Sequence, residues 1–382
     1  MNVYDVIVIG GGFIGVSSAY HLARLGSRVL LLEAYDIASG TSGACSGRTQ
    51  VNEGHLDDLN LFLIREGYKR HQTLSEELGM PTDWHPLGYL CLVKEGQDHL
   101  WTSWSERAVA LSKAGIPTEM LDVKSVQEAE PKLNTDGVMG AAFSVEGVLN
   151  PFRLCYAYVE AAKRFGAEVR AYTPVTAFEI EGQRVVSVVA GKERFSAGVV
   201  AVMCGAWTPT VTRLAGIEVP IQHTAAEAFI TEPLPPLINN TIGLADFYET
   251  IHGKGKAVSF GVSPHLEGSL LVGEAVTMTS ELHRRVTSWG VSLVAAELAH
   301  YFPTLGHFSI IRSWGRPTSF TPDEEPIIGW LPGLDNLYTA SCMIETITKV
   351  PLMGEYIAQD IRQERVSIPF ERFSPLRFAA QR

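Results

Sequence analysis

The sequence predicts an α/β protein in which a Rossmann-type βαβ unit is combined with an inserted α+β part that carries an antiparallel sheet. The chain up to Glu33 has the order of strand, glycine-rich turn, helix and second strand that a βαβ unit requires. A third apolar run at residues 199–203 is typical of a buried parallel strand. Helix and hairpin patterns lie between these runs and interrupt the alternation of strands and helices, which indicates an insertion.

The turn after the first strand predicts a site for a dinucleotide. Residues 6–9 are apolar, as in a strand buried on both faces, and the glycines that follow complete the pattern G-x-G-x-x-G. Gly10 allows the tight turn, Gly12 allows the backbone to approach a pyrophosphate, and Gly15 allows the helix to pack closely on the strand. The helix expected at residues 14–25 would point its free N–H groups and its positive dipole end at the phosphates.

Glu33 follows the second expected strand, at residues 28–32. At the carboxyl end of that strand, its carboxylate can accept hydrogen bonds from both ribose hydroxyls, and it would repel the 2′-phosphate of NADP. An ordinary glycine-rich loop is the alternative explanation of the motif alone. Because strand, helix, second strand and acid are all in register, we favour an ADP-containing dinucleotide.

The composition narrows the class of protein. A chain of 382 residues and 41.7 kDa favours about two domains. The net charge of -11 and the pI near 5.5 argue against nucleic-acid binding, which needs a clustered basic face, and favour a small-molecule substrate. The five cysteines include no C-x-x-C pair and the histidines show no ligand spacing, so we expect reduced thiols and no metal site.

Signals for export or membrane insertion are not found in the sequence. The N-terminal apolar run has no basic region before it and continues directly into the glycine turn. No uninterrupted apolar stretch reaches the 18 residues or more that a spanning helix needs. We therefore expect a cytoplasmic protein without a transmembrane segment, and peripheral association with a membrane stays compatible with the sequence.

The segment after Glu33 predicts a loop that lies along the dinucleotide. Residues 39–50, SGTSGACSGRTQ, are too rich in glycine and small polar residues for a helix or a strand. Their backbone and hydroxyl groups, notably those of Thr41 and Ser42, can follow a pyrophosphate and the ring system beyond it. A flexible surface linker is the alternative.

The middle of the chain mixes helices and strands. We expect a strand at residues 84–93 and helices at residues 57–78, 100–114, 123–129 and 151–165. The buried strand at residues 199–203 is followed by Cys204, Gly205, Ala206 and Trp207, where glycine and a small residue let the chain pass close beneath a cofactor. Val175 lies at an expected strand end, where its backbone can pair with an adenine edge. Core packing is the alternative for both features.

The rest of the chain is expected to complete both the nucleotide-binding part and the inserted α+β part. Residues 220–303 predict an antiparallel sheet with a long helix, and residues 313–332 predict a turn-rich stretch that leads into a short apolar strand. A strand at residues 336–340 precedes a loop and helix at residues 341–361, whose N-terminus would stabilise negative charge in the cleft. We place the nucleotide domain at residues 1–80, 147–215 and 305–382, and the substrate domain at residues 81–146 and 216–304.

Together these motifs resemble the superfamily of D-amino acid oxidase and glycine/sarcosine oxidase, over essentially the whole chain. The resemblance rests on the N-terminal motif with Glu33, on TSGACSG at residues 41–47, on AVMCGAW at residues 201–207 and on FTPDEEPIIG at residues 320–329. It implies an FAD-binding Rossmann-type domain with an inserted α+β substrate domain. The residues that it implies as FAD contacts are Gly10, Gly12, Phe13, Ile14, Gly15, Glu33, Ala34, Thr41, Ser42, Gly47, Arg48, Val175, Gly205, Trp207, Ile347 and Thr348.

The sequence also departs from the pattern of this superfamily. The glycine-histidine pair before the last helix is Ser341-Cys342 here, and the glycine that follows it is Thr346. No cysteine lies just before residues 320–324, where some sarcosine oxidases tether the flavin, so we expect FAD to be bound without a covalent bond. The tyrosine and arginine that bind the substrate carboxylate in glycine oxidase-like members correspond to Gly261 and Thr318, although Arg316 can take the role of the arginine if the loop bulges.

The resemblance implies oxidation of the C–N bond of an amino acid or amine, with hydride transfer to the flavin and hydrolysis of the imine. This chemistry needs positioning and an electron sink more than a catalytic dyad. Arg316 and Lys349 are the candidates for electrostatic contact with substrate or flavin, with Gly261 in the pocket wall; for each charged residue, a solvated charge is the alternative.

Three functions compete on this basis. The first is the catalytic β subunit of a heteromeric dehydrogenase for an opine, proline or hydroxyproline, which passes electrons to partner subunits. The second is a self-contained glycine, sarcosine or D-amino acid oxidase that produces hydrogen peroxide. The third is a flavin-binding subunit without turnover. Because two carboxylate donors and a large side chain are replaced, we expect a substrate bulkier than glycine or sarcosine.

Overall fold

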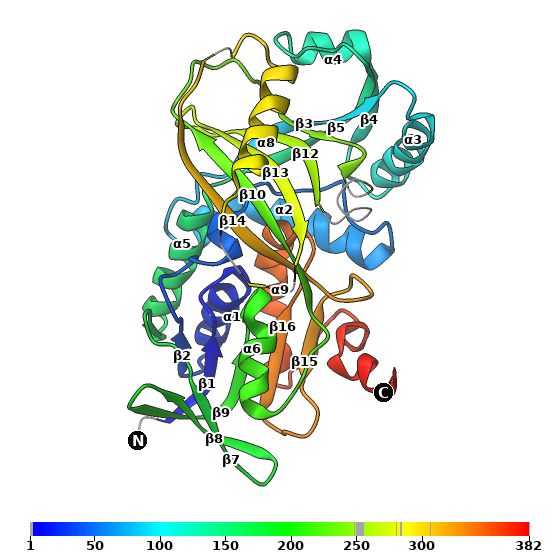
Figure 1. The fold of residues 1–382 in the computed structure, drawn as a ribbon. Coiled ribbons are helices and arrows are strands. Elements are labelled where there is room, and N and C mark those ends of the chain that lie inside the picture. Colours follow the sequence, from blue (N-terminus) through cyan, green and yellow to red (C-terminus); the bar gives the residue numbers. More distant parts are fainter. Residues whose placement is uncertain are drawn as a thin grey trace.

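The computed structural model describes residues 3–247, 249, 256–279, 281–282, 285–305 and 307–381. Its strands form two eight-stranded sheets. One sheet lies in the half of the molecule that carries both chain ends, and the other lies in the opposite half (Figure 1).

The first sheet is built mainly from buried parallel strands. In the order β15-β16-β9-β1-β2-β6, neighbouring strands are parallel except for β15 and β16. All four residues of β2 are buried, as the continuous apolar sequence predicts. The strands are β1 Val3–Ile9, β2 Val29–Leu32, β6 Glu168–Arg170, β9 Glu193–Val202, β15 Ile327–Trp330 and β16 Leu337–Ser341, and the hairpin of β7 Ala177–Glu181 and β8 Arg184–Ala190 pairs with β9.

Helices α1 Phe13–Arg24, α2 Asp58–Glu77, α5 Pro151–Arg164 and α9 Thr346–Ile361 share one apolar cluster with this sheet. Helix α2 begins where the Asp57 side chain accepts a hydrogen bond from the Asn60 N–H, a standard N-cap. Helices α1 and α9 approach so closely that a Cβ on Gly354 would lie 2.0 Å from Ser17 Oγ. This close packing fixes the N-terminus of α9 relative to the glycine turn.

The second sheet is mixed, with the order β14-β10-β13-β12-β11-β3-β5-β4 and one parallel pair, β11 and β3. Helix α8 Ser288–Tyr301 covers one face of it, where Val294 and Leu298 belong to the same core as Phe260 and Val272. The strands are β3 His85–Lys94, β4 Thr118–Asp122, β5 Val138–Val148, β10 Gln222–Thr231, β11 Thr241–Leu244, β12 Lys256–Pro264, β13 Leu270–Met278 and β14 Ile310–Phe320; helices α3 Asp98–Lys113 and α4 Val123–Ala129 lie near β4 (Figure 1).

Strand β14 corrects the sequence prediction, which expected a turn-rich stretch from residue 313. The segment Ile310–Phe320 is one long strand paired with β10 along its length. Its proline, Pro317, is compatible with a strand because β14 lies at the edge of the sheet, where one side needs no N–H donor. The domain boundary predicted at residue 305 therefore falls too early, because β14 belongs to the second sheet. The division into two discontinuous domains otherwise stays a prediction.

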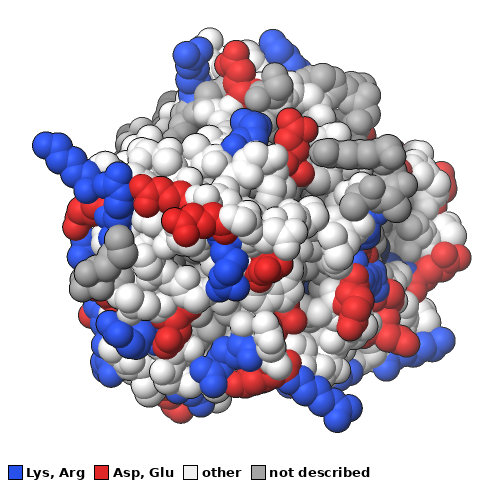
Figure 2. All heavy atoms as spheres, turned by 90° about the horizontal axis from the view of Figure 1, so that it is seen from below, with Lys and Arg blue, Asp and Glu red and all other residues white. Residues whose placement is uncertain are grey.

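Short elements connect these parts. They are η1 Thr41–Ala44, η2 Gly205–Trp207, α6 Thr208–Thr212, η3 Arg213–Ala215, η4 Phe370–Phe373 and η5 Pro375–Gln381. Across the described residues, every helix falls short of the combined length and apolarity needed to cross a membrane, and no group of three or more His, Cys, Asp or Glu side chains is placed to hold a metal ion. Figure 2 shows basic and acidic side chains interspersed on one face of the molecule.

Candidate active site

A cavity of about 420 Å³ lies between the glycine turn of the first sheet and the open face of the second sheet. Its walls come from segments far apart in the sequence: the start of α1, the loop around η1, the face of the second sheet and the start of α9. Of the residues predicted from the sequence, those that line it are Gly12, Phe13, Ile14, Thr41, Ser42, Arg48, Gly205, Gly261, Arg316, Thr318 and Ile347.

The glycine turn has the geometry that its pattern predicts. Gly10 has φ of +119°, and a Cβ there would lie 2.3 Å from the Met203 carbonyl oxygen. A Cβ on Gly15 would lie 1.9 Å from the Gly10 carbonyl oxygen, so helix and strand can meet only at glycine. Gly12 caps α1 without a side chain, and the first helical N–H, that of Phe13, donates to Ser42 Oγ over 3.0 Å.

Glu33 lies directly after β2, at the edge of the sheet where the glycine turn begins. Its Oε2 accepts from the Gly11 N–H at 2.7 Å and its Oε1 accepts from the Tyr35 N–H at 2.9 Å. The backbone therefore fixes the carboxylate beside the turn, while the neighbouring Ala34 is exposed. This position fits a carboxylate that binds a ribose.

The loop after Glu33 is anchored to the second sheet and is not a free surface linker. Thr41 Oγ1 donates to the Pro317 carbonyl at 2.6 Å, and Trp314 Nε1 donates to the Ala44 carbonyl at 2.9 Å. Both partners are on β14. The loop therefore joins the glycine turn to the second sheet and closes one side of the cavity.

Several predicted FAD contacts lie outside the cavity lining. Gly47 packs against the segment between β5 and α5, where a Cβ would lie 2.2 Å from the Leu149 carbonyl oxygen. Val175 is in the loop between β6 and β7, and the Trp207 ring lies against Gly40. Thr348 is buried and donates from Oγ1 to the Gln50 carbonyl at 2.7 Å. A contact of these four residues with the cofactor stays a prediction.

Arg48 lines the cavity but is engaged by two glutamates that sequence reasoning missed. Its Nε and Nη2 donate to Glu146 Oε2 at 3.0 and 2.8 Å, and Nη2 also pairs with Glu53 Oε1 at 3.2 Å. The guanidinium lies 3.8 Å from the ring centroid of Tyr89 on β3. Burial raises the pKa of Glu146, and Arg48 opposes that shift. No spacing in the sequence brings together positions 48, 53 and 146, because the contacts are made by folding.

Arg316 lies on β14, lines the cavity and has an unused donor. Its Nη2 pairs with Glu274 Oε2 at 2.9 Å. Its Nε is buried and has no hydrogen-bond partner in the protein. A buried donor without a partner is costly, and an acceptor on a ligand would satisfy it. Thr318, the residue aligned with the superfamily arginine, is two positions further along the same strand and is exposed.

Gly261 belongs to a row of three glycines in the floor of the cavity. Gly243 pairs with Gly261, and Gly261 pairs with Gly273, so three adjacent strands carry glycine at the same level. A Cβ on Gly261 would meet its nearest atoms only at 3.6 and 3.7 Å. The protein itself thus has room for a side chain at Gly261, and the glycine leaves that room to a ligand.

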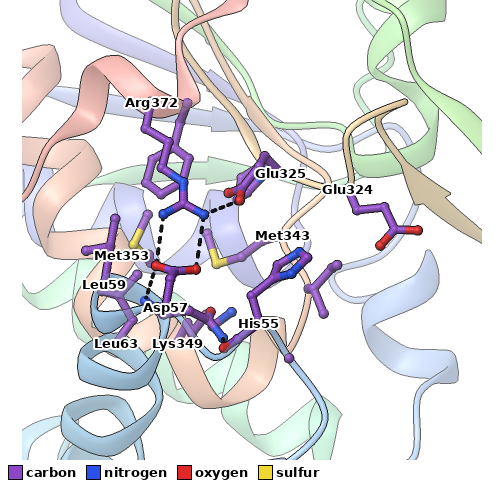
Figure 3. Close-up of a pocket in the computed structure, with 15 residues that line it drawn as sticks. His55, Asp57, Leu59, Leu63, Glu324, Glu325, Met343, Lys349, Met353 and Arg372 are labelled. Atoms are coloured by element: carbon purple, nitrogen blue, oxygen red, sulfur yellow. Dashed lines mark hydrogen bonds and ion pairs between the residues drawn. The ribbon is translucent and has the colours of Figure 1, made fainter.

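Lys349 lies beside the cavity rather than in it. Its Nζ pairs with Glu345 Oε2 at 2.9 Å, and both side chains are almost fully buried, at 7% and 1% exposure. Lys349 lines a neighbouring small pocket, in which Arg372 pairs with Asp57 and Glu325 (Figure 3). Glu345 lines the main cavity, and Lys349 adjoins that cavity through this ion pair.

Two cysteines also line the cavity, Cys45 and Cys342. Burial raises the pKa of both thiols, that of Cys342 to about 12. Both are therefore thiols at neutral pH and poor nucleophiles. This protonation state fits the expectation of FAD held without a covalent bond.

The fold and this site are those of a protein suited to bind a dinucleotide at a βαβ turn, with a cavity beside that turn and beneath a second sheet. The family described as FAD dependent oxidoreductase matches residues 5–360, and the chain belongs to that family. It is an FAD-dependent oxidoreductase, and the predicted fold, cofactor and enzyme class are thereby confirmed.

Relatives and solved structures of this kind align over most of the chain. The sarcosine oxidase subunit beta of Rhodobacter capsulatus is 24% identical, over 86% of this chain and 78% of its own length. The glycine oxidase of Bacillus licheniformis is 26% identical, over 94% of this chain and 93% of its own length. The glycine oxidase structure from Geobacillus kaustophilus has a TM-score of 0.87 at 22% identity and covers 98% of both chains. The L-proline dehydrogenase structure from P. horikoshii has a TM-score of 0.85 at 26% identity and covers 99% of this chain and 98% of its own.

The residues present fit FAD. Gly12 leaves the backbone at the turn open to a pyrophosphate, and Glu33 is held beside the turn, where a carboxylate can bind a ribose. Ile347 and Thr346, in the first turn of α9, line the other end of the cavity, where the positive end of the helix dipole favours negative charge on a flavin.

Proposed function

We propose that this chain oxidises the C–N bond of an amino acid with a substituent on its nitrogen, an opine-like or cyclic imino acid. In this proposal it is the catalytic β subunit of a heteromeric dehydrogenase. When bound, FAD accepts the hydride that leaves the substrate carbon, and the imine then hydrolyses in water. The single observation that carries the substrate assignment is the room at Gly261 in the cavity that Arg316, with its unpartnered Nε–H, also lines.

The residues of the chain would act chiefly by positioning. Arg316 Nε–H would hold the substrate carboxylate, while Glu274 keeps the guanidinium in place from the other side. The floor at Gly243, Gly261 and Gly273 would accept the nitrogen substituent. Fixing the carboxylate at one end and the substituent at the other orients the reacting carbon, which is the main requirement of hydride transfer.

Two comparisons bear on the electron acceptor. Similarity to a sarcosine oxidase subunit beta supports a role as one subunit among several. Similarity to glycine oxidase along 93% of that protein favours the second candidate, a self-contained oxidase. The third candidate function is a flavin-binding subunit without turnover. Anaerobic titration with amines tests it, because in such a subunit no amine would bleach the flavin absorbance.

Turnover with a dye acceptor and with oxygen tests the proposal. Glycine, sarcosine, proline and opines should be compared on the chain alone and with any subunits that co-purify. We expect the bulky amines to be oxidised faster, with the dye or partner as acceptor. Faster oxidation of glycine or sarcosine than of every bulky amine, with oxygen as acceptor, would contradict it.

Arg316→Met should lower kcat/KM for a carboxylated amine about 10- to 150-fold, because a charge-assisted hydrogen bond contributes about 1.5–3 kcal/mol. Arg316→Lys should recover part of the lost kcat/KM because lysine retains the positive charge. The recovery should be incomplete because lysine lacks the planar fork of donors. Steady-state kinetics on both variants measures this. An Arg316→Met enzyme with unchanged kcat/KM would remove Arg316 from the site.

FAD should be released by acid precipitation, because no cysteine lies just before residues 320–324 and burial raises the pKa of both cavity thiols. The yellow chromophore is expected in the supernatant, measured by its absorbance. Colour that stays in the protein pellet would show a covalent bond, and Cys45→Ser and Cys342→Ser would then identify the attached sulfur.

A further inference from the structure

Helix α9 contains a proline, Pro351, in its second turn. In an α-helix the N–H at position 351 would donate to the carbonyl of residue 347, four residues earlier. Proline has no N–H, so the Ile347 carbonyl loses its partner within the helix. Ile347 lies in the first turn of α9 and lines the cavity. The helix therefore lacks one backbone hydrogen bond directly behind the turn that lines the cavity.

His71 of α2 supplies the missing donor. Its Nε2 lies 2.7 Å from the Ile347 carbonyl oxygen, and the side chain is 1% exposed. A carbonyl oxygen only accepts hydrogen bonds, so Nε2 carries the ring proton. Burial lowers the pKa of His71 to about 4, so the imidazole is neutral near pH 7, and its Nδ1 has no hydrogen-bond partner among the described residues. The proton of the neutral ring is therefore committed to the carbonyl that Pro351 leaves free.

Close packing holds α2 and α9 in the register that this hydrogen bond needs. Gly67 lies one turn before His71 on α2, and a Cβ on it would lie 2.2 Å from the Thr348 carbonyl oxygen. Glycine thus lets α2 approach the backbone of α9, and His71 reaches the adjacent carbonyl. From α1, Ser17 Oγ donates to the Val350 carbonyl at 3.0 Å. The start of α9 is thus held by α1 and α2 where its own hydrogen bonding is incomplete.

We propose that His71 is a positioning residue for the flavin. It donates to the Ile347 carbonyl in place of Pro351 and so fixes the first turn of α9. The N–H groups of that turn have no partner within the helix, and its positive dipole end favours negative charge on the reduced flavin ring. His71 is not a lining residue of the cavity, so it would act through Ile347. The inference requires FAD in the cavity and does not depend on which amine is the substrate.

Variants of His71 test this role, with the Kd for FAD and the midpoint potential of bound FAD as the measurements. His71→Leu leaves the Ile347 carbonyl buried without its donor. We expect reduced FAD to be weakened about fivefold more than oxidised FAD, which corresponds to a midpoint potential about 20 mV more negative. His71→Gln retains an N–H donor near the position of Nε2 and should keep this ratio within about twofold of the wild type. His71→Asn is too short to reach the carbonyl and should resemble His71→Leu.

Pro351→Ala gives the sharper test, because it restores the backbone N–H at position 351. In the double variant of His71→Leu with Pro351→Ala, that N–H can donate to the Ile347 carbonyl, so the potential should return most of the way to the wild-type value. Pro351→Ala alone should stay near the wild type, because the carbonyl oxygen can accept from both donors. Such non-additivity indicates a shared partner, whereas a general loss of packing at position 71 would persist in the double variant.

His21→Leu is the matched control. His21 of α1 is also a buried histidine, and it bonds the carbonyl of Pro351, one turn further from the start of α9. Its loss should lower the melting temperature of the protein. The midpoint potential should stay at the wild-type value, because the Ile347 carbonyl keeps its hydrogen bond from His71.

A His71→Leu protein with the wild-type potential and FAD affinity would overturn the role of His71, and so would a loss that Pro351→Ala does not relieve. If His71→Leu does not fold, the contrast between His71→Gln and His71→Asn decides the question, and recovery of folding in the double variant supports the hydrogen bond. Failure of the wild type to oxidise any N-substituted amino acid would overturn the proposed function and leave the role of His71 standing.

Discussion

Gly12→Val is expected to yield a folded protein that contains essentially no FAD. Gly12 lies at the cap of α1 and lines the cavity, so its side-chain position is the space that a pyrophosphate needs. Within the protein, an added Cβ would meet only the Ser42 side chain, at 2.9 Å from Oγ, and that hydroxyl can rotate away at the cost of its hydrogen bond from the Phe13 N–H. The substitution should therefore spare the fold and remove the cofactor. The ratio of flavin to protein absorbance measures the loss, and circular dichroism checks the fold.

Gly15→Ala provides the contrast. A Cβ at Gly15 would lie 1.9 Å from the Gly10 carbonyl oxygen, which is backbone and cannot turn away. We expect this smaller substitution to lower the thermal stability of the apoprotein, whereas Gly12→Val leaves it nearly unchanged. A Gly12→Val protein that retains FAD at the wild-type ratio would show that the cofactor does not approach this turn.

Lys349→Met should destabilise the protein by about 3–5 kcal/mol, because it leaves Glu345 buried without its cation. The Gly54 N–H still donates to Glu345 Oε1 at 2.8 Å, but one neutral donor does not replace a charge. The same negative charge faces the cavity at the start of α9, so the midpoint potential of bound FAD should become more negative. Chemical denaturation and redox titration measure the two effects.

The double variant Lys349→Met with Glu345→Gln is the control, because it removes both charges. It should recover most of the stability and return the potential toward the wild-type value, as a double-mutant cycle on a true ion pair requires. A single variant as stable as the wild type, or a double variant no better than the single one, would contradict the pairing.

Local sequence predicted much of the first sheet and most of the longer helices of both parts. Residues 123–129 form α4, at the predicted boundaries, and α1, α2, α3 and α5 begin or end within two residues of the expected positions. These elements are encoded by apolar periodicity and by caps such as Asp57 and Asn150, which act over a few residues. The glycine turn was predicted for the same reason, because each of its glycines has a steric cause in the adjacent strand and helix.

The long edge strand β14 was missed because its signal is not local. Its Gly315 and Pro317 resemble turn residues, and only pairing with β10 and the edge position make the segment a strand. Strand β5 was likewise not foreseen, although it pairs with both β3 and β4. Strand pairing between distant segments outweighs intrinsic preference, which is weak and dependent on context in sheets.

The sequence by itself determined the dinucleotide turn, the acid that follows it and the combination of a parallel and an inserted antiparallel part. Only the tertiary structure decided that Arg48 pairs with both Glu53 and Glu146, that Arg316 has a buried donor without a partner in the protein, and that the ion pair of Lys349 with Glu345 is buried. Backbone turns and caps depend on neighbours in the chain, so a pattern reveals them. The pairing of Arg48 with Glu146 and the walls of the cavity join residues separated by about a hundred positions or more, and their geometry exists only after the two sheets have packed.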